Sequence, residues 1–289
     1  MTYMHEHLRI DLSGQKGDPD CLLDEYEKTR DELKSLAERG LRRIVDMSCY
    51  GLGRDCGFIM RMTAETGINV VISTGFYKDP FMPEIVEKSG ERELAGIMIE
   101  DIEKKGARII GEIGTGLNRM TPNEEKVFRA AAIAHEKTNV PVSTHTTLGT
   151  MGLHQIGLLK SLGVNPEKII IGHLDLADDV GLIINALDEG VYVEFDTAGK
   201  TRYLSDQRRA DLIKECCDRG YEKRLLLSMD ITRRSHLKAN GGPGYAYLVD
   251  SFLPLLRNTG VSQTAVNEML VSNPDRILGP CDPAQKDFS

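Results

Sequence analysis

The 289-residue sequence contains no tryptophan, and only 6% of its residues are aromatic. It has no apolar stretch near the roughly 18 residues that a membrane-spanning helix needs. Basic residues are not in excess either, because 36 Lys and Arg stand against 44 Asp and Glu, a formal net charge of −8. A general nucleic-acid surface requires a basic stripe. We therefore expect no nucleic-acid partner and no membrane partner.

The six cysteines do not form a disulfide pattern. None of them has C-x-x-C spacing, and the first five residues lack the basic and apolar regions of a secretory signal. We therefore expect reduced thiols and a cytoplasmic location. Hydrophobic residues make up 40% and charged residues 28% of the chain, which is typical of a globular protein.

Short apolar runs rich in β-branched residues recur along the chain and alternate with segments rich in Glu, Lys, Leu and Ala. Continuous apolar runs favour strands buried on both faces of a parallel sheet. The intervening segments predict helices, for example over 24–38 and 123–137. The second of these follows a capping-box sequence, Thr121-Pro122-Asn123-Glu124. With an N-terminal run added, the predicted strands are 3–7, 43–47, 69–73, 108–112, 140–145, 169–173, 191–195 and 225–230.

Eight strand–helix units predict an α/β fold, a (β/α)₈ TIM barrel. No linker, low-complexity stretch or shift in composition divides the chain, so we expect a single domain over residues 1–289. Segment 245–278 is expected to hold the helices of the eighth unit. Because the first predicted strand begins close to residue 1, we expect no preceding segment to fill the amino-terminal end of the barrel.

Histidines and carboxylates recur at the carboxyl-terminal ends of these strands. His5 and His7 are separated by one residue, so on a strand both imidazoles share a face. Further along, one such residue ends each of four predicted strands: Glu112, His145, His173 and Asp230. A single histidine at a strand end is more often a hydrogen-bonded structural residue. Four of only seven histidines at one layer of a barrel instead indicate a metal centre.

This ligand set suits a pair of divalent metal ions. Imidazoles with carboxylates favour zinc, while manganese, cobalt and iron remain alternatives. Glu112 is placed to bridge the two ions. A water shared by two such ions loses a proton near neutral pH and becomes a hydroxide nucleophile. Asp230 is the candidate catalytic residue, since it can accept that proton and deliver it to a leaving group.

The other three histidines give weaker signals. His135 and His154 lie on predicted helices and are interpreted as surface or packing residues. His236 follows the last predicted strand closely, and a role in lining the pocket and a structural role are equally supported by its position.

Five stretches of the chain carry a family resemblance: 4–12, 111–115, 142–146, 172–175 and, most specifically, 227–242. Together they resemble the phosphotriesterase family of the amidohydrolase superfamily, and within it the phosphotriesterase homology proteins. The resemblance implies that His5, His7 and Asp230 hold a buried metal ion. It also implies that His145 and His173 hold an exposed ion and that Glu112 bridges the two.

This sequence departs from the phosphotriesterases proper, in which a carboxylated lysine forms the bridge. Glu112 supplies a carboxylate directly, so efficient organophosphate hydrolysis is not expected. Relatives in this branch include lactonases, some of which act on phosphorylated sugar lactones. By that resemblance Tyr77 orients the ester carbonyl, the alternative being a packed loop aromatic. Lys200 and Arg233 are candidates to bind a substrate phosphate or carboxylate, the alternative being ordinary surface charges.

These observations predict a metal-dependent hydrolase of a small anionic ester or lactone, with a phosphorylated sugar lactone as the leading substrate. Three alternatives remain: a phosphotriester or phosphoester hydrolase, a TatD-type nuclease, and a non-catalytic metal- or ligand-binding barrel. A DNA-cleavage assay separates the nuclease, and a screen of esters and lactones separates the non-catalytic barrel. The expected oligomeric state is a homodimer.

Overall fold

Residues 1–281 of the computed structural model are described. Eight parallel strands follow one another around a barrel in the order β1–β4–β5–β6–β7–β8–β9–β10. Near the end of β10 the chain returns to β1, where the Ser228 hydroxyl (2.7 Å) and the Asp230 amide (3.2 Å) both donate to the His5 carbonyl. The predicted TIM barrel is confirmed. The strands are β1 Thr2–Glu6, β4 Arg43–Asp46, β5 Asn69–Thr74, β6 Ile109–Thr115, β7 Val142–Thr146, β8 Ile169–Gly172, β9 Tyr192–Phe195 and β10 Leu225–Leu227.

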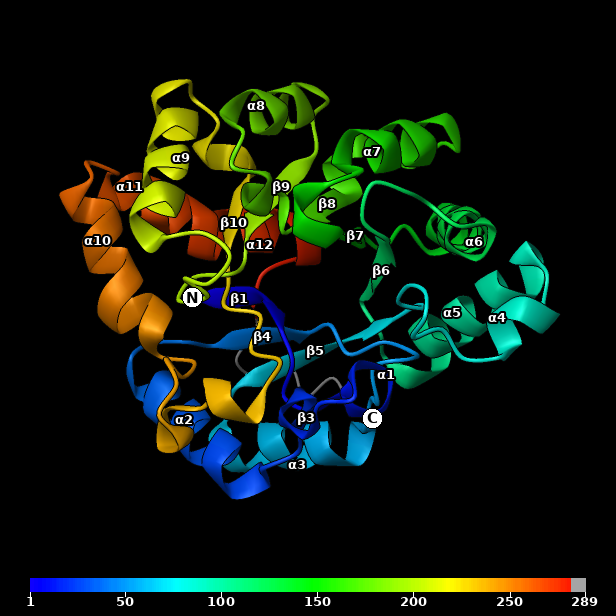
Figure 1. Cartoon of the computed structure of the whole chain (residues 1–289), viewed down its shortest axis with the longest axis horizontal. Helices are drawn as coiled ribbons and strands as arrows, with labels where there is room; N and C mark the ends of the chain where they lie inside the picture. The colour runs from blue at the N-terminus through cyan, green and yellow to red at the C-terminus, as the bar shows by residue number, and fades with distance from the viewer. Residues whose placement is uncertain (282–289) are drawn as a thin grey trace.

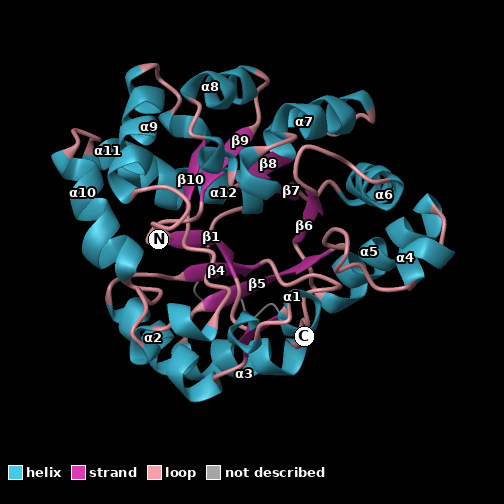
Figure 2. Ribbon diagram, in the orientation of Figure 1, coloured by secondary structure: helices cyan, strands magenta, loops and turns pink. Residues whose placement is uncertain are grey.

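Helices surround this ring of strands (Figures 1 and 2). The principal ones are α2 Tyr26–Glu38, α3 Cys56–Thr66, α5 Glu91–Lys105, α6 Pro122–Thr138, α7 Gly152–Ser161, α8 Val180–Asp188 and α9 Asp206–Asp218. The shorter ones include α1 Ser13–Lys16, α4 Ile85–Lys88, α10 Leu253–Asn258, α11 Gln263–Asn267 and α12 Asn273–Leu278. The last three belong to the predicted eighth unit. A two-stranded ribbon of β2 (Ile10–Asp11) and β3 (Leu22–Leu23) was not predicted, because two-residue strands leave no periodic pattern.

The start of α6 shows how local sequence sets an element. The Thr121 hydroxyl accepts from the Glu124 amide at 3.2 Å, and the Glu124 carboxylate accepts from the Thr121 amide at 2.8 Å. This is the predicted capping box, which satisfies two amide donors that the helix itself leaves free. Pro122 occupies the first helical turn, where a missing amide hydrogen costs nothing.

The amino-terminal end of the barrel is filled from the far end of the sequence. Ile277 and Leu278 of α12 belong to one buried apolar cluster with residues from seven barrel strands or their ends: Met4, Val45, Met47, Val71, Ile109, Ile170, Tyr192 and Leu226. The C-terminal segment therefore supplies apolar side chains to the amino-terminal end of the barrel.

Cations hold this segment in place. Arg43 donates from Nη1 to the Gly279 carbonyl at 2.8 Å, and Lys168 donates from Nζ to the Ile277 carbonyl at 3.0 Å. The last carbonyls of a helix lack intrahelical partners and carry partial negative charge, so basic side chains stabilise them. Within residues 1–281, no helix has the length and apolar character needed to cross a membrane.

Candidate metal centre

All six predicted metal ligands meet at the carboxyl-terminal end of the barrel. His5 lies within β1 and His7 just after it, and the other four ligands lie within or just after β6, β7, β8 and β10. Two sets of three residues bring one ligand atom each within 4.8 Å of the others: His5 with His7 and Asp230, and His5 with Glu112 and His173. The first set is the one that the resemblance assigns to the buried ion.

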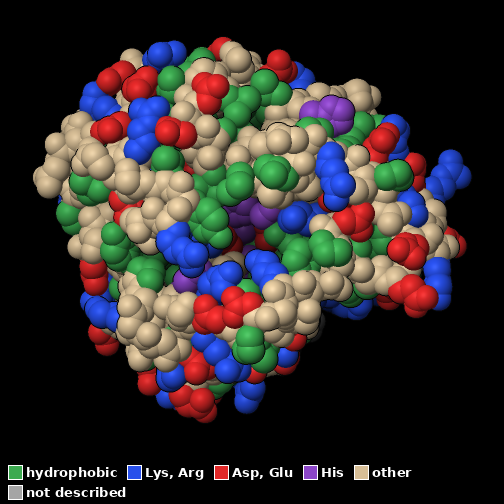
Figure 3. All heavy atoms as spheres, in the orientation of Figure 1, with side chains coloured by type: hydrophobic (Ala, Val, Ile, Leu, Met, Phe, Trp, Pro, Cys, Tyr) green, Lys and Arg blue, Asp and Glu red, His purple; other side chains and the backbone are tan. Residues whose placement is uncertain are grey.

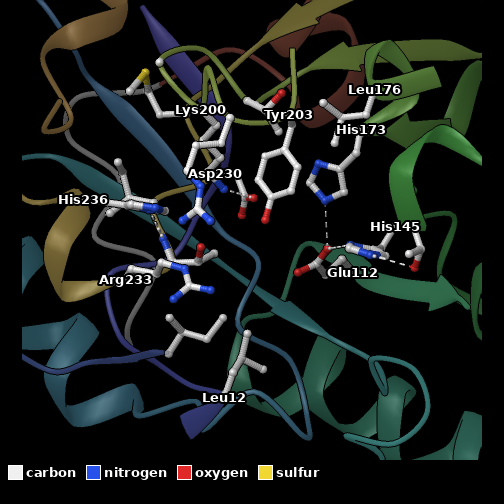
Figure 4. Close-up of a pocket in the computed structure, with 18 of the residues that line it drawn as sticks. Leu12, Glu112, His145, His173, Leu176, Lys200, Tyr203, Asp230, Arg233 and His236 are labelled. Atoms are coloured by element: carbon white, nitrogen blue, oxygen red, sulfur yellow. Dashed lines mark hydrogen bonds and ion pairs between the residues drawn. The ribbon is translucent and has the colours of Figure 1, made fainter. Parts of the chain in front are cut away.

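The two oxygens of Glu112 face different histidines. Oε1 lies 3.3 Å from His7 Nε2. Oε2 lies 3.0 Å from His145 Nδ1 and 3.5 Å from both His173 Nε2 and His5 Nε2 (Figure 4). Burial alone would raise the pKa of Glu112, but the His5 charge and the hydrogen bonds of His145 and His173 hold it well below its usual value. Glu112 is therefore an ionised carboxylate whose oxygens contact histidines of both predicted ligand groups, a position suited to the predicted bridging ligand.

Asp230 presents one oxygen to the histidines and the other to a cation. Its Oδ1 lies 3.3 Å from His7 Nε2, and its Oδ2 forms an ion pair with Lys200 Nζ. Burial opposes ionisation, but the Lys200 charge and the adjacent His7 imidazole hold the pKa of Asp230 well below its usual value. The carboxylate thus remains charged and available both as a ligand and as a proton acceptor.

The imidazole rings of these histidines are oriented like those of metal-binding histidines. Both ring nitrogens of His5 and Nε2 of His7 are buried without a hydrogen-bond partner among the described residues, a costly arrangement unless another group binds them. Where the outer nitrogens have partners, these are oxygens: Ser48 Oγ lies 2.9 Å from His7 Nδ1, and Asp196 Oδ1 lies 2.7 Å from His173 Nδ1. Such outer contacts fix which ring nitrogen faces the metal. The residues therefore fit a divalent metal centre.

Sequence reasoning missed two carboxylates behind the ligands. Glu194 and Asp196 lie at the end of β9, fully buried, and their oxygens approach His5 Nδ1 to 3.5 and 3.4 Å. Asp196 also binds His173, so one carboxylate supports ligands from both groups. The signal was present, because Glu194 and Asp196 have the same alternate-residue spacing on a strand as His5 and His7.

Glu6, between the two histidines of β1, was also missed. Its side chain accepts hydrogen bonds from Ser228 Oγ (2.8 Å), the Met229 amide (2.8 Å) and the Ile231 amide (3.1 Å). These donors flank Asp230, whose φ of +50° is unusual for a residue other than glycine. Glu6 therefore holds the strained segment that positions Asp230, the predicted catalytic residue.

Four of the six predicted ligands line a cavity of about 570 Å³: Glu112, His145, His173 and Asp230. His5 and His7 are fully buried. Figure 3 shows histidine side chains within a hollow that Lys and Arg side chains border on part of its rim. Tyr77, Lys200, Arg233 and His236 all line this cavity, and the Tyr77 hydroxyl lies 3.2 Å from His145 Nδ1. Tyr77 is thus beside the ligands rather than packed in a remote loop, and His236 is a pocket residue.

The two predicted anion-binding cations already have carboxylate neighbours. Lys200 pairs with Asp230, and Arg233 Nη1 lies 2.7 Å from Asp18 Oδ2. Of the remaining histidines, His135 is buried with Nδ1 2.7 Å from the Val140 carbonyl, and His154 is exposed. Both agree with the structural interpretation.

This chain is similar in sequence and in structure to known proteins. The model of the phosphotriesterase family matches residues 1–278. The chain is 48% identical to the phosphotriesterase homology protein of Escherichia coli K12 over 283 residues, 96% of this chain and 97% of the other. A crystal structure of that protein, complexed with phosphate in the active site, superposes with a TM-score of 0.94, covering 96% and 98% of the two chains.

More distant relatives have named activities. The chain is 32% identical over 310 residues to a phospho-furanose lactonase of Mycoplasmopsis synoviae, with 96% and 87% of the two chains covered. It is 29% identical over 295 residues to an aryldialkylphosphatase of Saccharolobus solfataricus, with 96% and 94% covered. The prediction of a hydrolase is confirmed at the level of the family. With its barrel and its His–Glu–Asp centre, this chain belongs to the phosphotriesterase family.

Proposed function

We propose that this protein hydrolyses a small anionic ester or lactone, with a phosphorylated sugar lactone as the leading substrate, at a centre of two divalent ions. Zinc is the expected metal, because imidazoles and carboxylates are its usual ligands. The observation that carries the proposal is the cluster of four histidines and two carboxylates, four of which line a cavity of about 570 Å³ that five basic side chains also line. A cavity of that size suits a compact ligand.

The ligands divide naturally between two ions. In this proposal His5, His7 and Asp230 hold the buried ion, His145 and His173 hold the exposed ion, and Glu112 bridges them. The contact of His7 with Oε1 of Glu112 and of His145 with Oε2 supports this division, and His5 also lies 3.5 Å from Oε2. When bound, two divalent ions supply a hydroxide nucleophile at neutral pH and polarise the substrate carbonyl.

Side chains of the protein carry out proton transfer and substrate orientation. Asp230 accepts the proton of the nucleophile and transfers it to the leaving alkoxide. Lys200 holds the second oxygen of Asp230, which keeps the carboxylate oriented during this transfer. The Tyr77 hydroxyl, beside His145, is positioned to hydrogen-bond the ester carbonyl.

Two relatives support the choice of substrate. One is a phospho-furanose lactonase, and a crystal structure of another contains phosphate in its active site. The second candidate function is phosphotriester hydrolysis, which the aryldialkylphosphatase relative favours. The two differ in the electrophile, a carbonyl carbon or a phosphorus, so one screen separates them.

The test is hydrolysis of paired substrates by the metal-loaded protein: a sugar lactone, its phosphorylated form and a phosphotriester. We expect the phosphorylated lactone to have the highest kcat/KM. Lys200→Ala and Arg233→Ala should each lower that value roughly 10- to 150-fold if they contact the anion, the value of one charge-assisted contact. Faster turnover of the phosphotriester than of either lactone would contradict the proposal.

A further inference from the structure

Five Lys and Arg side chains line the cavity, and they differ in whether a carboxylate neutralises their charge. Lys200 and Arg233 have carboxylate partners. The side chains of the other three make no ion pair or hydrogen bond within residues 1–281: Lys16, Lys78 and Arg202. Lys16 and Arg202 are exposed and hydrated, whereas Lys78 is half-buried. Lys78 is therefore the least hydrated of the unpaired cations.

The neighbours of Lys78 hold its ammonium without neutralising it. Nζ lies 5.6 Å from the centre of the Tyr77 ring and 5.8 Å from that of Phe81, which are cation–π distances. Carboxylates in this part of the site are engaged elsewhere. Glu124 caps α6, Glu112 faces the histidines of the centre, and Asp79, the next residue in the chain, accepts a hydrogen bond from the Thr121 hydroxyl at 2.6 Å. Partial burial of an unpaired ammonium is unfavourable, and a bound anion would offset that penalty.

Tyr77 connects Lys78 to the predicted centre. Lys78 follows Tyr77 in the chain with its Nζ 5.6 Å from the centre of the Tyr77 ring, and the Tyr77 hydroxyl lies 3.2 Å from His145 Nδ1. Lys16 lines the same cavity. Among the described residues, Lys78 thus has its ammonium free beside Tyr77, whereas Lys200 is engaged by Asp230.

We propose that Lys78, assisted by Lys16, forms the binding site for the anionic group of the substrate that does not react, a phosphate monoester in the leading case. This inference rests on the proposed function and specifies where its substrate is recognised. A phosphate dianion beside Lys78 supplies the partner that its ammonium lacks, and the exposed Lys16 on the same cavity adds a second positive charge. The lactone carbonyl then lies toward Glu112 and Tyr77.

The test compares selectivity in Lys78→Met, Lys78→Arg and Lys16→Met with the wild type. The matched control is Lys88→Met, since Lys88 lies on α4 a short distance along the chain with a 67% exposed side chain paired to Glu84. We measure the ratio of kcat/KM for a phosphorylated lactone to that for its unphosphorylated form. Loss of one charge-assisted contact should lower this ratio about 10- to 100-fold in Lys78→Met. Lys16→Met should lower it less, and Lys78→Arg and Lys88→Met should largely retain it.

A binding measurement separates failure of this inference from failure of the proposed function. Calorimetric titration of the metal-loaded proteins with ribose 5-phosphate and with ribose reports the anion site without turnover. A wild-type preference for phosphate that Lys78→Met retains, in turnover and in binding, overturns the inference and leaves the proposed function intact. Lys78-dependent binding of ribose 5-phosphate without lactone turnover supports the site and overturns the proposed reaction. No preference for phosphate in either measurement overturns both.

Discussion

The two ends of the barrel are built from the same strands but filled with opposite chemistry. At the amino-terminal end, Met4 and Ile109 belong to an apolar cluster that Ile277 and Leu278 complete. At the carboxyl-terminal end, the same strands carry histidines and carboxylates with unpartnered buried nitrogens. The apolar end contributes stability to the fold. The polar end can hold buried charges because packing elsewhere in the barrel stabilises the structure. Substitutions at the two ends should therefore have separable effects.

The largest effect is expected at Asp230. Asp230→Asn preserves the shape of the side chain but removes its charge and its ability to accept a proton. Loss of general-base catalysis is worth roughly 10²- to 10⁴-fold in rate. The measurement is kcat of the variant, with its metal content determined in the same sample. A normal rate in a variant that retains its metal would show that Asp230 does not transfer the proton.

A smaller effect is expected behind the ligands. Asp196→Asn weakens the support of His173 Nδ1, 2.7 Å away, and of His5. Loss of such an outer contact typically lowers metal affinity 10- to 100-fold. Competition with a chelator measures this affinity directly, and Asp188→Asn, on the exposed end of α8, is the control. Equal affinity in both variants would mean that Asp196 does not orient the ligands.

The centre should respond least to a change at the opposite end. Ile277→Ala removes buried apolar contacts and should lower the free energy of unfolding by about 2–5 kcal/mol. Metal content and kcat of the folded variant should stay near wild-type values. Val271→Ala, at a 40% exposed side chain, is the control, with an expected change below about 0.5 kcal/mol. Metal loss from folded Ile277→Ala would show that the two ends are coupled.

The sequence predicted the polar end better than the apolar end, for a physical reason. Parallel strands in a barrel bring their carboxyl ends together. Histidines and carboxylates at those ends must therefore lie close together, whatever the exact first residue of each strand. Glu112, His145 and His173 were located in this way. The apolar end had no comparable signal, because Ile277 and Leu278 close a short helix whose pattern does not reveal its packing partner.

Within the site, the ligands were predictable but their supports were only partly so. Asp196 and Glu194 repeat the spacing of His5 and His7, which was sufficient to suggest inward-facing side chains. The pairing of Lys200 with Asp230 depends on how the loop after β9 bends toward β10, and no local pattern specifies that bend. The contact of Lys200 and Arg233 with substrate stays a prediction.

The central claim is that Glu112 and its five partner ligands bind two metal ions that the reaction requires. Elemental analysis of the purified protein tests it most directly, alongside activity before and after removal of the metal by a chelator. We predict about two divalent ions per chain, loss of activity on their removal, recovery on their return, and loss of one or both ions in Glu112→Gln. Full activity in metal-free protein would contradict the account.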